Sequence, residues 1–590
     1  MIRIQLTIPE PGNHLVSVEM RLQPRLARLC LQLPGWTPGS YLIRDYVRNL
    51  EGLQVHQGVQ PVACERLGPA CWRLAVDPAG PELLIGYRVV ATELSVRTPH
   101  LDDQHGFLPL AAVVLEVEGE RWSPHQLCCS LPPGWQAFTP LPGDPSEGVT
   151  ARDLDQLLDS PLEIGPHREH RFAVAGVPHR WVTWAGQPEQ AQWLLDRHPS
   201  LLADVEQVCL ACCRLMGVER PAADAYLVIL HMLDEGYGGL EHDDAMVLVY
   251  GRRNIEKPDG YRRFLQLVAH EYLHQWNVRR LRPAELTPID YHQPVAVPTL
   301  WFAEGITSYV DQLLPLTAGL CTTDAFLEDL GAELSRYCLT PGRGVQSLRT
   351  SSQEAWVKLY KADAYAGDSQ VSYYLKGTVI ALCLDLHLRA AGSCLAQVLQ
   401  ELWQSHGRWG RGYSEADLIA AFACHAPDLE ALLPTWLQSV DDPDLDGYLR
   451  RIGLRLEPVE ATIPWTGLTV IAEGGRLLTQ RVRRGSPAEQ AGLMVGDELI
   501  AIDGQRLADG DVVRDGQRPA GLPPGARDEQ LRVGPEELRP RGGHRHLEDP
   551  HDRRDDLPLP ARPALHRAAA GAVVLRELPA HDVCHAVRAV

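Results

Sequence analysis

The first part of the chain alternates apolar and polar residues in short runs. Apolar side chains occupy alternate positions over residues 2–8 and 18–22, and proline and glycine separate such runs as far as about residue 165. Because successive side chains on a strand point to opposite faces, a period of two predicts half-buried strands. Many short strands divided by turn residues are typical of an antiparallel β-sandwich. We therefore predict an N-terminal β-sandwich domain at residues 1–170.

The pattern changes near residue 188 and becomes mixed. Residues 189–216 have helical spacing, and the apolar runs 225–232 and 245–250 enclose a glycine-rich turn, which predicts strand, turn and strand. Helical spacing then dominates as far as residue 450. We predict a mostly helical domain at residues 171–455, which makes the chain a multidomain α+β protein.

A third pattern follows, and it resembles a PDZ domain. Ser486-Pro487 begins a short predicted helix, Gly496-Asp497 forms a turn, and a strand ends at Asp503-Gly504. We assign this small PDZ domain to residues 456–508. The resemblance implies a peptide or protein ligand, although the usual peptide-binding loop has only a loose counterpart in Gly467-Leu-Thr-Val470.

The last 82 residues, 509–590, lack the residues that build a core. They contain no Phe, Tyr, Trp or Ile and are rich in Arg, Pro, Gly, His and Asp. Such a composition buries too little apolar surface to offset the entropy of ordering the chain. We therefore predict either a disordered tail or an out-of-frame translation product, which would leave the PDZ domain truncated.

Composition and charge exclude several classes of function. The net charge of −20 repels a phosphate backbone, so we expect no nucleic-acid binding. We find no run of eighteen apolar residues and no basic start followed by an apolar core, so we expect neither a membrane span nor a secretory signal. Fourteen cysteines without a paired framework indicate free thiols and a cytoplasmic protein.

Residues 261–278 form a predicted helix that carries His270, Glu271 and His274. Residues four apart lie on the same face of a helix, so the two imidazoles can bind one ion. Glu271 then points into the space beside that ion. Two neutral nitrogens and a free carboxylate are what a zinc-bound water and its general base require. The alternative is a structural cluster with no metal, because this pattern also arises by chance.

A second predicted helix, residues 300–310, carries a lone carboxylate, Glu304, among apolar neighbours. A buried charge without a partner costs several kcal/mol, and a zinc ion would supply that partner. Two histidines, one glutamate and a water complete a four-coordinate catalytic site. Asp311, two turns later, is either a group that orients a ligand histidine or an ordinary surface residue.

These helices, taken with three further segments, resemble the glycyl aminopeptidase family of zinc metallopeptidases, in the thermolysin-like (gluzincin) superfamily. The segments are Trp36-Thr-Pro-Gly-Ser-Tyr41, Gly238-Gly-Leu-Glu-His242 and Tyr374-Leu-Lys-Gly377. With the PDZ segment, the likeness covers most of residues 1–505. It implies a thermolysin-like zinc catalytic domain at residues 171–455, between the β-sandwich and the PDZ domain.

The resemblance also implies the metal ligands and the groups that act on the peptide bond. The zinc ligands would be His270, His274 and Glu304, holding one ion per chain. Glu271 would be the general base that activates the water and returns the proton to the leaving amine. Tyr374, in preference to the adjacent Tyr373, would donate a hydrogen bond to the oxygen on which charge develops.

The segment Gly238-Gly-Leu-Glu-His242 resembles the substrate-binding strand of these aminopeptidases. Glu241 would bind the α-ammonium of the substrate, whereas the residues alone favour a solvated turn. Gly238 and Gly239 would let the substrate backbone approach closely. His242 stands where the larger alanyl-aminopeptidase family has Asn, which favours the glycyl branch.

We therefore predict a cytoplasmic zinc aminopeptidase that acts on peptides and removes small N-terminal residues such as Gly or Ala, a preference that rests on the resemblance alone. The first alternative is a thermolysin-like endopeptidase whose PDZ domain captures unfolded chains. The second alternative is a non-catalytic PDZ scaffold with a structural zinc ion.

Overall fold

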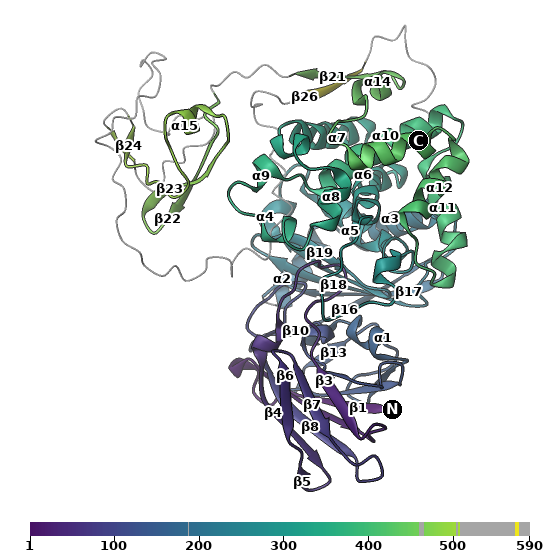
Figure 1. Ribbon diagram of the computed structural model, residues 1–590, viewed down its shortest axis with the longest axis vertical. Coiled ribbons are helices and arrows are strands. Elements are labelled where there is room, and N and C mark those ends of the chain that lie inside the picture. Colours follow the sequence, from purple (N-terminus) through teal and green to yellow (C-terminus); the bar gives the residue numbers. More distant parts are fainter. Residues whose placement is uncertain (187, 459–464, 503–504, 508–572, 578–590) are drawn as a thin grey trace. The chain divides into compact units, whose positions relative to one another are not determined.

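The computed structural model describes the chain except for residues 187, 459–464, 503–504, 508–572 and 578–590 (Figure 1). It contains two compact units, Met1–Thr322 with Ala391–Leu429 and Thr323–Ala390 with Glu430–Val590. The predicted multidomain α+β class is confirmed.

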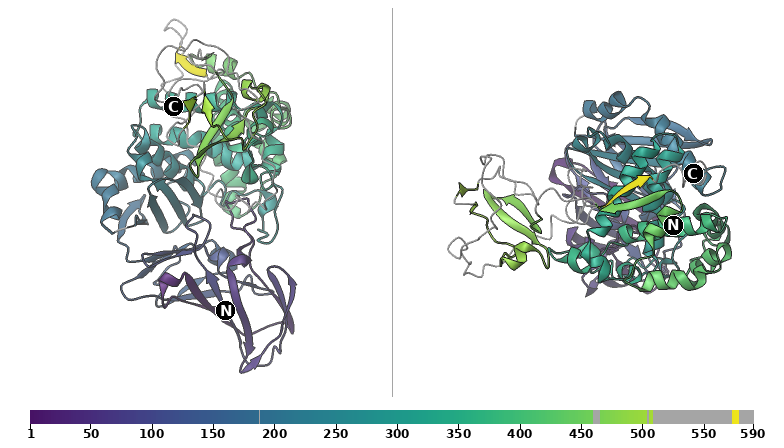
Figure 2. Two further views of the ribbon diagram at one scale, coloured as in Figure 1. Left: turned by 90° about the vertical axis from the view of Figure 1, so that its left-hand side faces the viewer. Right: turned by 90° about the horizontal axis from the view of Figure 1, so that it is seen from above.

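Three sheets build the N-terminal part of the first unit, drawn in purple to blue in Figures 1 and 2. The largest has the strand order β14-β12-β1-β2-β8-β4-β5, and only β1 and β12 run parallel. Its strands are Ile2–Thr7 (β1), Leu15–Leu22 (β2), Leu50–Gln57 (β4), Gln60–Pro61 (β5), Leu83–Val90 (β8), His125–Ser130 (β12) and Val149–Ala151 (β14). Alternate residues of β1 are buried, as the period of two requires.

Two smaller sheets complete this β-rich domain, in the orders β13-β15-β10-β9 and β11-β3-β7-β6. Their strands are Arg28–Gln32 (β3), Cys64–Gly68 (β6), Cys71–Ala75 (β7), His100–Leu101 (β9), Gly106–Leu108 (β10), Glu116–Val117 (β11), Gln136–Phe138 (β13) and Leu162–Gly165 (β15). A short helix, α1 (Leu154–Leu158), begins at Asp153, whose side chain accepts a hydrogen bond from the Gln156 amide.

A five-stranded sheet follows in the first unit, with the order β16-β17-β18-β20-β19. Its strands are Glu169–Val174 (β16), Val177–Trp184 (β17), Tyr226–Leu233 (β18), Tyr237–Glu241 (β19) and Ala245–Gly251 (β20). The central strand β18 is buried almost throughout, which explains its continuous apolar sequence. Strand β19, which contains Gly238, Gly239 and Glu241, forms an edge of the sheet.

The helices of the first unit are Pro188–Arg197 (α2), Leu201–Leu215 (α3), Arg252–Ile255 (α4), Gly260–Leu273 (α5), Ile306–Thr317 (α6), Leu395–Ser405 (α11) and Glu415–His425 (α12). Helices α2, α3, α4 and α5 contact this sheet (Figure 1), and α5 also packs against α3 and α6. The predicted helix 189–216 is two helices, because Pro199 interrupts it. The predicted helix 261–278 ends at Leu273, and His274 is its C-terminal cap.

The second unit contains Thr323–Cys338 (α7), Leu348–Gln353 (α8), Ala366–Ser369 (α9), Tyr373–Ala390 (α10), Leu429–Gln438 (α13) and Leu445–Arg450 (α14). Its PDZ part has a hairpin of Leu468–Glu473 (β22) and Arg476–Val482 (β23), then α15 (Pro487–Gln490), Ala501–Ile502 (β24) and Gln505–Arg506 (β25). Ser486 caps α15 through the Glu489 amide, as the Ser-Pro sequence predicts.

Most of the predicted tail, residues 509–590, lies outside the described residues. Within it, Val573–Glu577 forms β26, which pairs antiparallel with Leu454–Pro458 (β21). This differs from a tail without structure, and the strand coincides with the consecutive aliphatic residues Val573-Val-Leu575. The Asp503-Gly504 end of the predicted PDZ strand also lies outside the described residues.

No single helix among the described residues has both the length and the apolar composition that a membrane span needs. One bent pair of segments, Ala366–Ala390 and Leu395–Trp409, meets these criteria when taken together.

Replacing Gly260 by Ala should destabilise the first unit. A Cβ at this first residue of α5 would collide with the backbone carbonyl oxygen of Asn254, and backbone cannot move aside as a flexible side chain can. Overpacking of this kind costs about 1–3 kcal/mol, so calorimetry should show a lower unfolding temperature. Gly12→Ala is the control, because a Cβ there meets nothing within 4 Å. Equal unfolding temperatures for the two variants would contradict this account of α5.

Candidate functional site

Helix α5 presents two imidazoles on one face, with ring centroids 4.6 Å apart. The Nδ1 atom of His270 lies 2.9 Å from Oδ2 of Asp311, and the Nδ1 atom of His274 lies 2.6 Å from the Asn277 carbonyl oxygen. Both partners are acceptors, so each Nδ1 carries the proton. The Nε2 lone pair of each ring is therefore available to a metal ion.

Glu304 faces both Nε2 atoms with a single oxygen. Its Oε2 lies 3.5 Å from Nε2 of His270 and 3.3 Å from Nε2 of His274. Ligands about 2.0–2.1 Å from a tetrahedral zinc ion lie about 3.3–3.4 Å from one another. The three side chains are buried, and their donor atoms group as a metal site requires. The observed separations therefore fit a zinc ion.

Glu304 lies on a π-helical turn, η5 (Trp301–Gly305), which leads directly into α6. A π turn widens the helix and changes its carbonyl pairing, and such turns are frequent at functional sites. The Asn277 side-chain amide donates to the carbonyl oxygens of Phe302 and Ala303 at 3.1 and 3.2 Å. Asn277 thus ties the end of the histidine helix to the turn that carries Glu304.

Burial raises the pKa of Glu304, but the charges and hydrogen bonds of the two imidazoles outweigh it and bring the pKa to about 2. For Glu271, the effects that raise the pKa outweigh those that lower it. Burial, assisted by the carboxylates of Glu241 and Glu304, raises its pKa to about 7 against the attraction of the imidazoles. Glu304 is therefore an ionised ligand, whereas Glu271 is suited to accepting and releasing a proton near neutral pH.

Glu241 ends strand β19 beside these groups and is only 3% exposed. Its carboxylate, the Glu271 carboxylate and a His274 nitrogen lie within 4.8 Å of one another. Among the described residues, Oε1 of Glu241 has no hydrogen-bond partner. It is a buried acceptor rather than the solvated turn residue that its sequence alone favours, and a buried carboxylate calls for a cationic partner.

The glycines of β19 differ in what surrounds them. A Cβ at Gly238 would meet nothing within 4 Å, whereas a Cβ at Gly239 would collide with the Glu271 carboxylate. Gly239 therefore makes room for Glu271, a function that the sequence does not predict. The predicted close approach of the substrate backbone applies more naturally to Gly238.

His242 is buried and turned toward the protein. Its Nδ1 lies 3.0 Å from Oδ1 of Asp159, and the same oxygen is 2.7 Å from the Arg279 guanidinium. This network holds the end of β19, and the predicted contact of His242 with substrate stays a prediction.

Tyr374 belongs to helix α10 of the second unit. Its hydroxyl lies 3.2 Å from that of Tyr360, and its ring stacks on Tyr373 with centroids 4.7 Å apart. Tyr373 is fully buried and Tyr374 is partly exposed. This difference favours Tyr374 over Tyr373 as a group that reaches substrate, and its role stays a prediction.

The structure gives roles to three residues for which the sequence predicts no role or leaves the role open. Asp311 is buried against His270 and so orients a ligand ring. Asn277 connects the end of the histidine helix to the π turn, through partners that lie about 25 residues later in the sequence. Gly39 has φ +86°, and a Cβ there would lie 2.5 Å from Oε2 of Glu241. In the sequence, this contact is marked by nothing more than the turn-rich segment Pro38-Gly-Ser40.

Three family models match the chain. The model described as M61 glycyl aminopeptidase matches residues 263–380, and that of the peptidase M61 N-terminal domain matches residues 3–166. A PDZ domain model matches residues 480–515. A comparison with curated proteins finds no match.

Solved structures also resemble the chain. An aminopeptidase N family protein from Idiomarina loihiensis is 30% identical, with a TM-score of 0.79, and the match covers 86% of this chain and 90% of that one. An M1 zinc metallopeptidase from Deinococcus radiodurans is 17% identical, with a TM-score of 0.48, and the match covers 75% of this chain and 94% of that one.

Replacing Asp311 by Asn should weaken zinc binding at this site. The variant preserves the shape of the acceptor but removes the charge beside Nδ1 of His270, which makes the imidazole a poorer ligand. Removal of such a group commonly lowers metal affinity about 10- to 100-fold. Competition with a chelator measures the affinity, and Asp324→Asn, an exposed position on α7, is the control. An unchanged affinity in the Asp311 variant would contradict the proposed orientation of His270.

Proposed function

Since this chain belongs to the M61 glycyl aminopeptidase family of metallopeptidases, we propose that it is a zinc-dependent aminopeptidase that hydrolyses the N-terminal peptide bond of peptides. The observation that carries the proposal is Glu241, a buried carboxylate beside the predicted zinc ligands. Its Oε1 has no hydrogen-bond partner in the described part of the chain. An exopeptidase needs such a group to recognise the chain end.

His270, His274 and Glu304 are the residues that would hold one zinc ion at this catalytic site. Zinc bound there would lower the pKa of a water molecule to about 7 and polarise the scissile carbonyl. Glu271 would accept a proton from the water whose oxygen adds to the carbonyl carbon, and would return that proton to the amine nitrogen as the C–N bond breaks. Burial raises the pKa of Glu271 above the usual range of a carboxyl group, which favours its taking up and releasing a proton.

We assign Tyr374 as the second hydrogen-bond donor to the oxygen on which negative charge develops. A tyrosine hydroxyl donates without being ionised at neutral pH. The partial exposure of Tyr374, compared with the complete burial of Tyr373, supports this choice.

The α-ammonium of a peptide substrate would bind the Glu241 carboxylate. A buried charge pair of this kind is strong because little solvent screens it, and it removes the cost of leaving Glu241 unpaired. The pair also selects the bond that is cleaved, because it fixes the N-terminus of the substrate so that the first peptide bond lies beside Glu271.

A preference for small N-terminal residues such as Gly or Ala agrees with the loop that contains Gly39. The backbone of Gly39 lies so close to Glu241 that a Cβ would be 2.5 and 2.6 Å from the two carboxylate oxygens. This loop limits the room beside the ammonium, where the first side chain of the substrate must fit.

Two broader features extend the proposal. The PDZ part, with hairpin β22–β23 and helix α15, would bind a peptide or protein ligand, although its loop is poorly marked in the sequence. A cytoplasmic location is proposed from the cysteines, since no disulfide joins those in the described part of the chain.

Replacing Glu241 by Gln should lower kcat/KM for peptides with a free N-terminus by roughly 30-fold or more, because the ammonium loses its buried charge partner. Hydrolysis of an unblocked peptide and its N-acetylated form would be measured side by side. Glu235→Gln, an exposed position just before the same strand, is the control. Undiminished cleavage by the Glu241 variant, with the N-acetylated peptide also cut, would instead indicate an endopeptidase.

Replacing Glu271 by Gln should abolish most turnover while zinc stays bound. The amide cannot accept the proton, and general-base catalysis is commonly worth roughly 100- to 10,000-fold. Zinc content and hydrolysis rate would be determined on the same preparation. Full activity in this variant would remove Glu271 from the mechanism, and inactivity of the unmodified protein would favour a scaffold with a structural zinc ion.

A further inference from the structure

A second group of histidines surrounds a carboxylate in the first unit, away from the residues discussed above. We call His105, Glu163, His167 and His231 the histidine cluster. Oε1 of Glu163 lies 3.0 Å from Nδ1 of His105 and 2.8 Å from Nε2 of His167. Its other oxygen, Oε2, lies 2.9 Å from Nε2 of His231. Three imidazoles thus converge on one carboxylate.

The cluster joins the β-rich domain to the five-stranded sheet. Glu163 is on β15, paired with Phe107 of β10, and His105 immediately precedes β10. His231 is on the central strand β18 of the five-stranded sheet. A buried apolar group lies between the same elements, formed by Val96, Phe107, Phe138, Val182, Leu227, Ile229, Leu240, Ala245 and Val247. The histidine cluster is therefore a buried polar cluster at the junction of two domains.

Burial makes a charge within the histidine cluster energetically costly. The side chains of His105, Glu163 and His231 are 0% exposed, and that of His167 is 6% exposed. A carboxylate buried this completely needs partners that offset the cost of its burial, and a metal ion held together with the imidazoles would be one.

Several imidazole nitrogen atoms of the cluster are not used by its internal hydrogen bonds. Among the described residues, Nε2 of His105 and Nδ1 of His231 have no hydrogen-bond partner. Nε2 of His167 is close to Oε1 of Glu163 but is not aligned for a hydrogen bond. A nitrogen that is close to the oxygen but directed elsewhere is the arrangement expected of two ligands that share an ion. The donor atoms of His105, Glu163 and His167 lie within 4.8 Å of one another.

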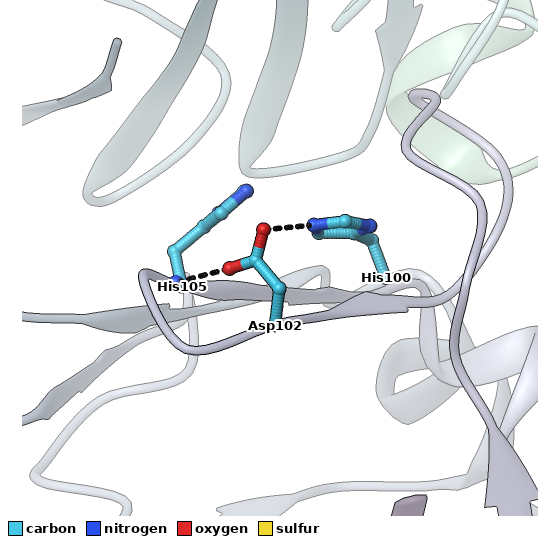
Figure 3. Close-up of side chains that lie close together, drawn as sticks. All are labelled: His100, Asp102 and His105. Atoms are coloured by element: carbon cyan, nitrogen blue, oxygen red, sulfur yellow. Dashed lines mark hydrogen bonds and ion pairs between the residues drawn. The ribbon is translucent and has the colours of Figure 1, made fainter. Parts of the chain in front are cut away.

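The surrounding backbone is shaped to hold these rings. A Cβ at Gly165 would lie 2.5 Å from Nε2 of His167, so a glycine is needed for that ring to fold back toward Glu163. Asp102 accepts hydrogen bonds from the backbone amide of His105 at 2.9 Å and from Nε2 of His100 at 3.2 Å, as Figure 3 shows. Trp184 stacks on the His105 ring with centroids 4.0 Å apart. The rings are held in place before any ligand binds.

We propose that His105, Glu163 and His167 bind a second divalent transition-metal ion, of which Zn²⁺ is the probe, at the junction of the β-rich domain and the five-stranded sheet. Imidazole nitrogens with one carboxylate oxygen suit such an ion. His231 orients Glu163 by donating to the oxygen that does not face the other two rings. The role of this ion is structural, because its ligands come from the residue before β10, from β15 and from the turn after β15, and leave it buried.

The test is the zinc content of the full-length protein after extensive dialysis. Unmodified protein should hold two zinc ions per chain, and His167→Gln should hold one. His270→Ala combined with His274→Ala should also hold one, because that pair removes only the predicted catalytic ligands. His170→Gln, a partly exposed histidine on β16, is the matched control and should hold two. One ion in the unmodified protein and none in the His270/His274 variant would overturn the proposal.

A second measurement keeps the test valid if His167→Gln folds poorly. The His270→Ala/His274→Ala protein would be unfolded by heat with Zn²⁺ and again with a strong chelator. The proposal expects a higher unfolding temperature with Zn²⁺, since an ion that binds only the folded state stabilises it. Identical unfolding temperatures would show that the cluster is only a network of hydrogen bonds. Because this variant lacks the predicted catalytic ligands, neither outcome depends on peptidase activity.

Discussion

One carboxylate oxygen, Oε2 of Glu304, faces two imidazole nitrogens in the interior of the first unit. Placing these charges in a medium of low dielectric is costly unless each has a partner, and the rest of the site depends on meeting that requirement. Asp311 and the Asn277 carbonyl direct the two rings, and the Asn277 amide fixes the π turn that carries Glu304. The separations that result fit a tetrahedral zinc ion.

The same requirement recurs at three buried carboxylates, and each is met differently. Glu304 has two imidazoles and a predicted metal ion. Glu241 has no partner among the described residues at its Oε1 atom, which suits a carboxylate that waits for the ammonium of a substrate. Glu163 has three imidazoles around it and lies where two domains meet. The three buried carboxylates thus differ in the groups that surround them, and the roles assigned to them are proposals.

Close backbone approach is the second constraint on the site. Gly239 leaves the space that the Glu271 side chain fills, and Gly39 lets a loop of the β-rich domain reach Glu241. Helix α5 depends in the same way on Gly260, whose neighbour is a backbone carbonyl. At each of these positions a glycine is required because atoms of another residue lie close to it. The sequence on either side of the glycine therefore does not predict the requirement.

The sequence by itself determined the family, the enzyme class and the order of domains, because these rest on local patterns. Periodicity of two or of 3.6 residues follows from the geometry of a strand or a helix, and the spacing of His270, Glu271 and His274 follows from one helical turn. The short helix after Ser486 was likewise predictable from its cap.

Only the tertiary structure decided how distant segments meet. Helix α5 ends at Leu273 rather than continuing to residue 278, and Glu304 lies on a π turn whose Phe302 carbonyl accepts a hydrogen bond from Asn277, 25 residues earlier in the chain. The burial of Asp311 and Glu241 and the convergence of His105, Glu163, His167 and His231 depend on contacts between separate strands and helices. Such contacts follow from how whole elements pack, and a local pattern contains no information about that packing.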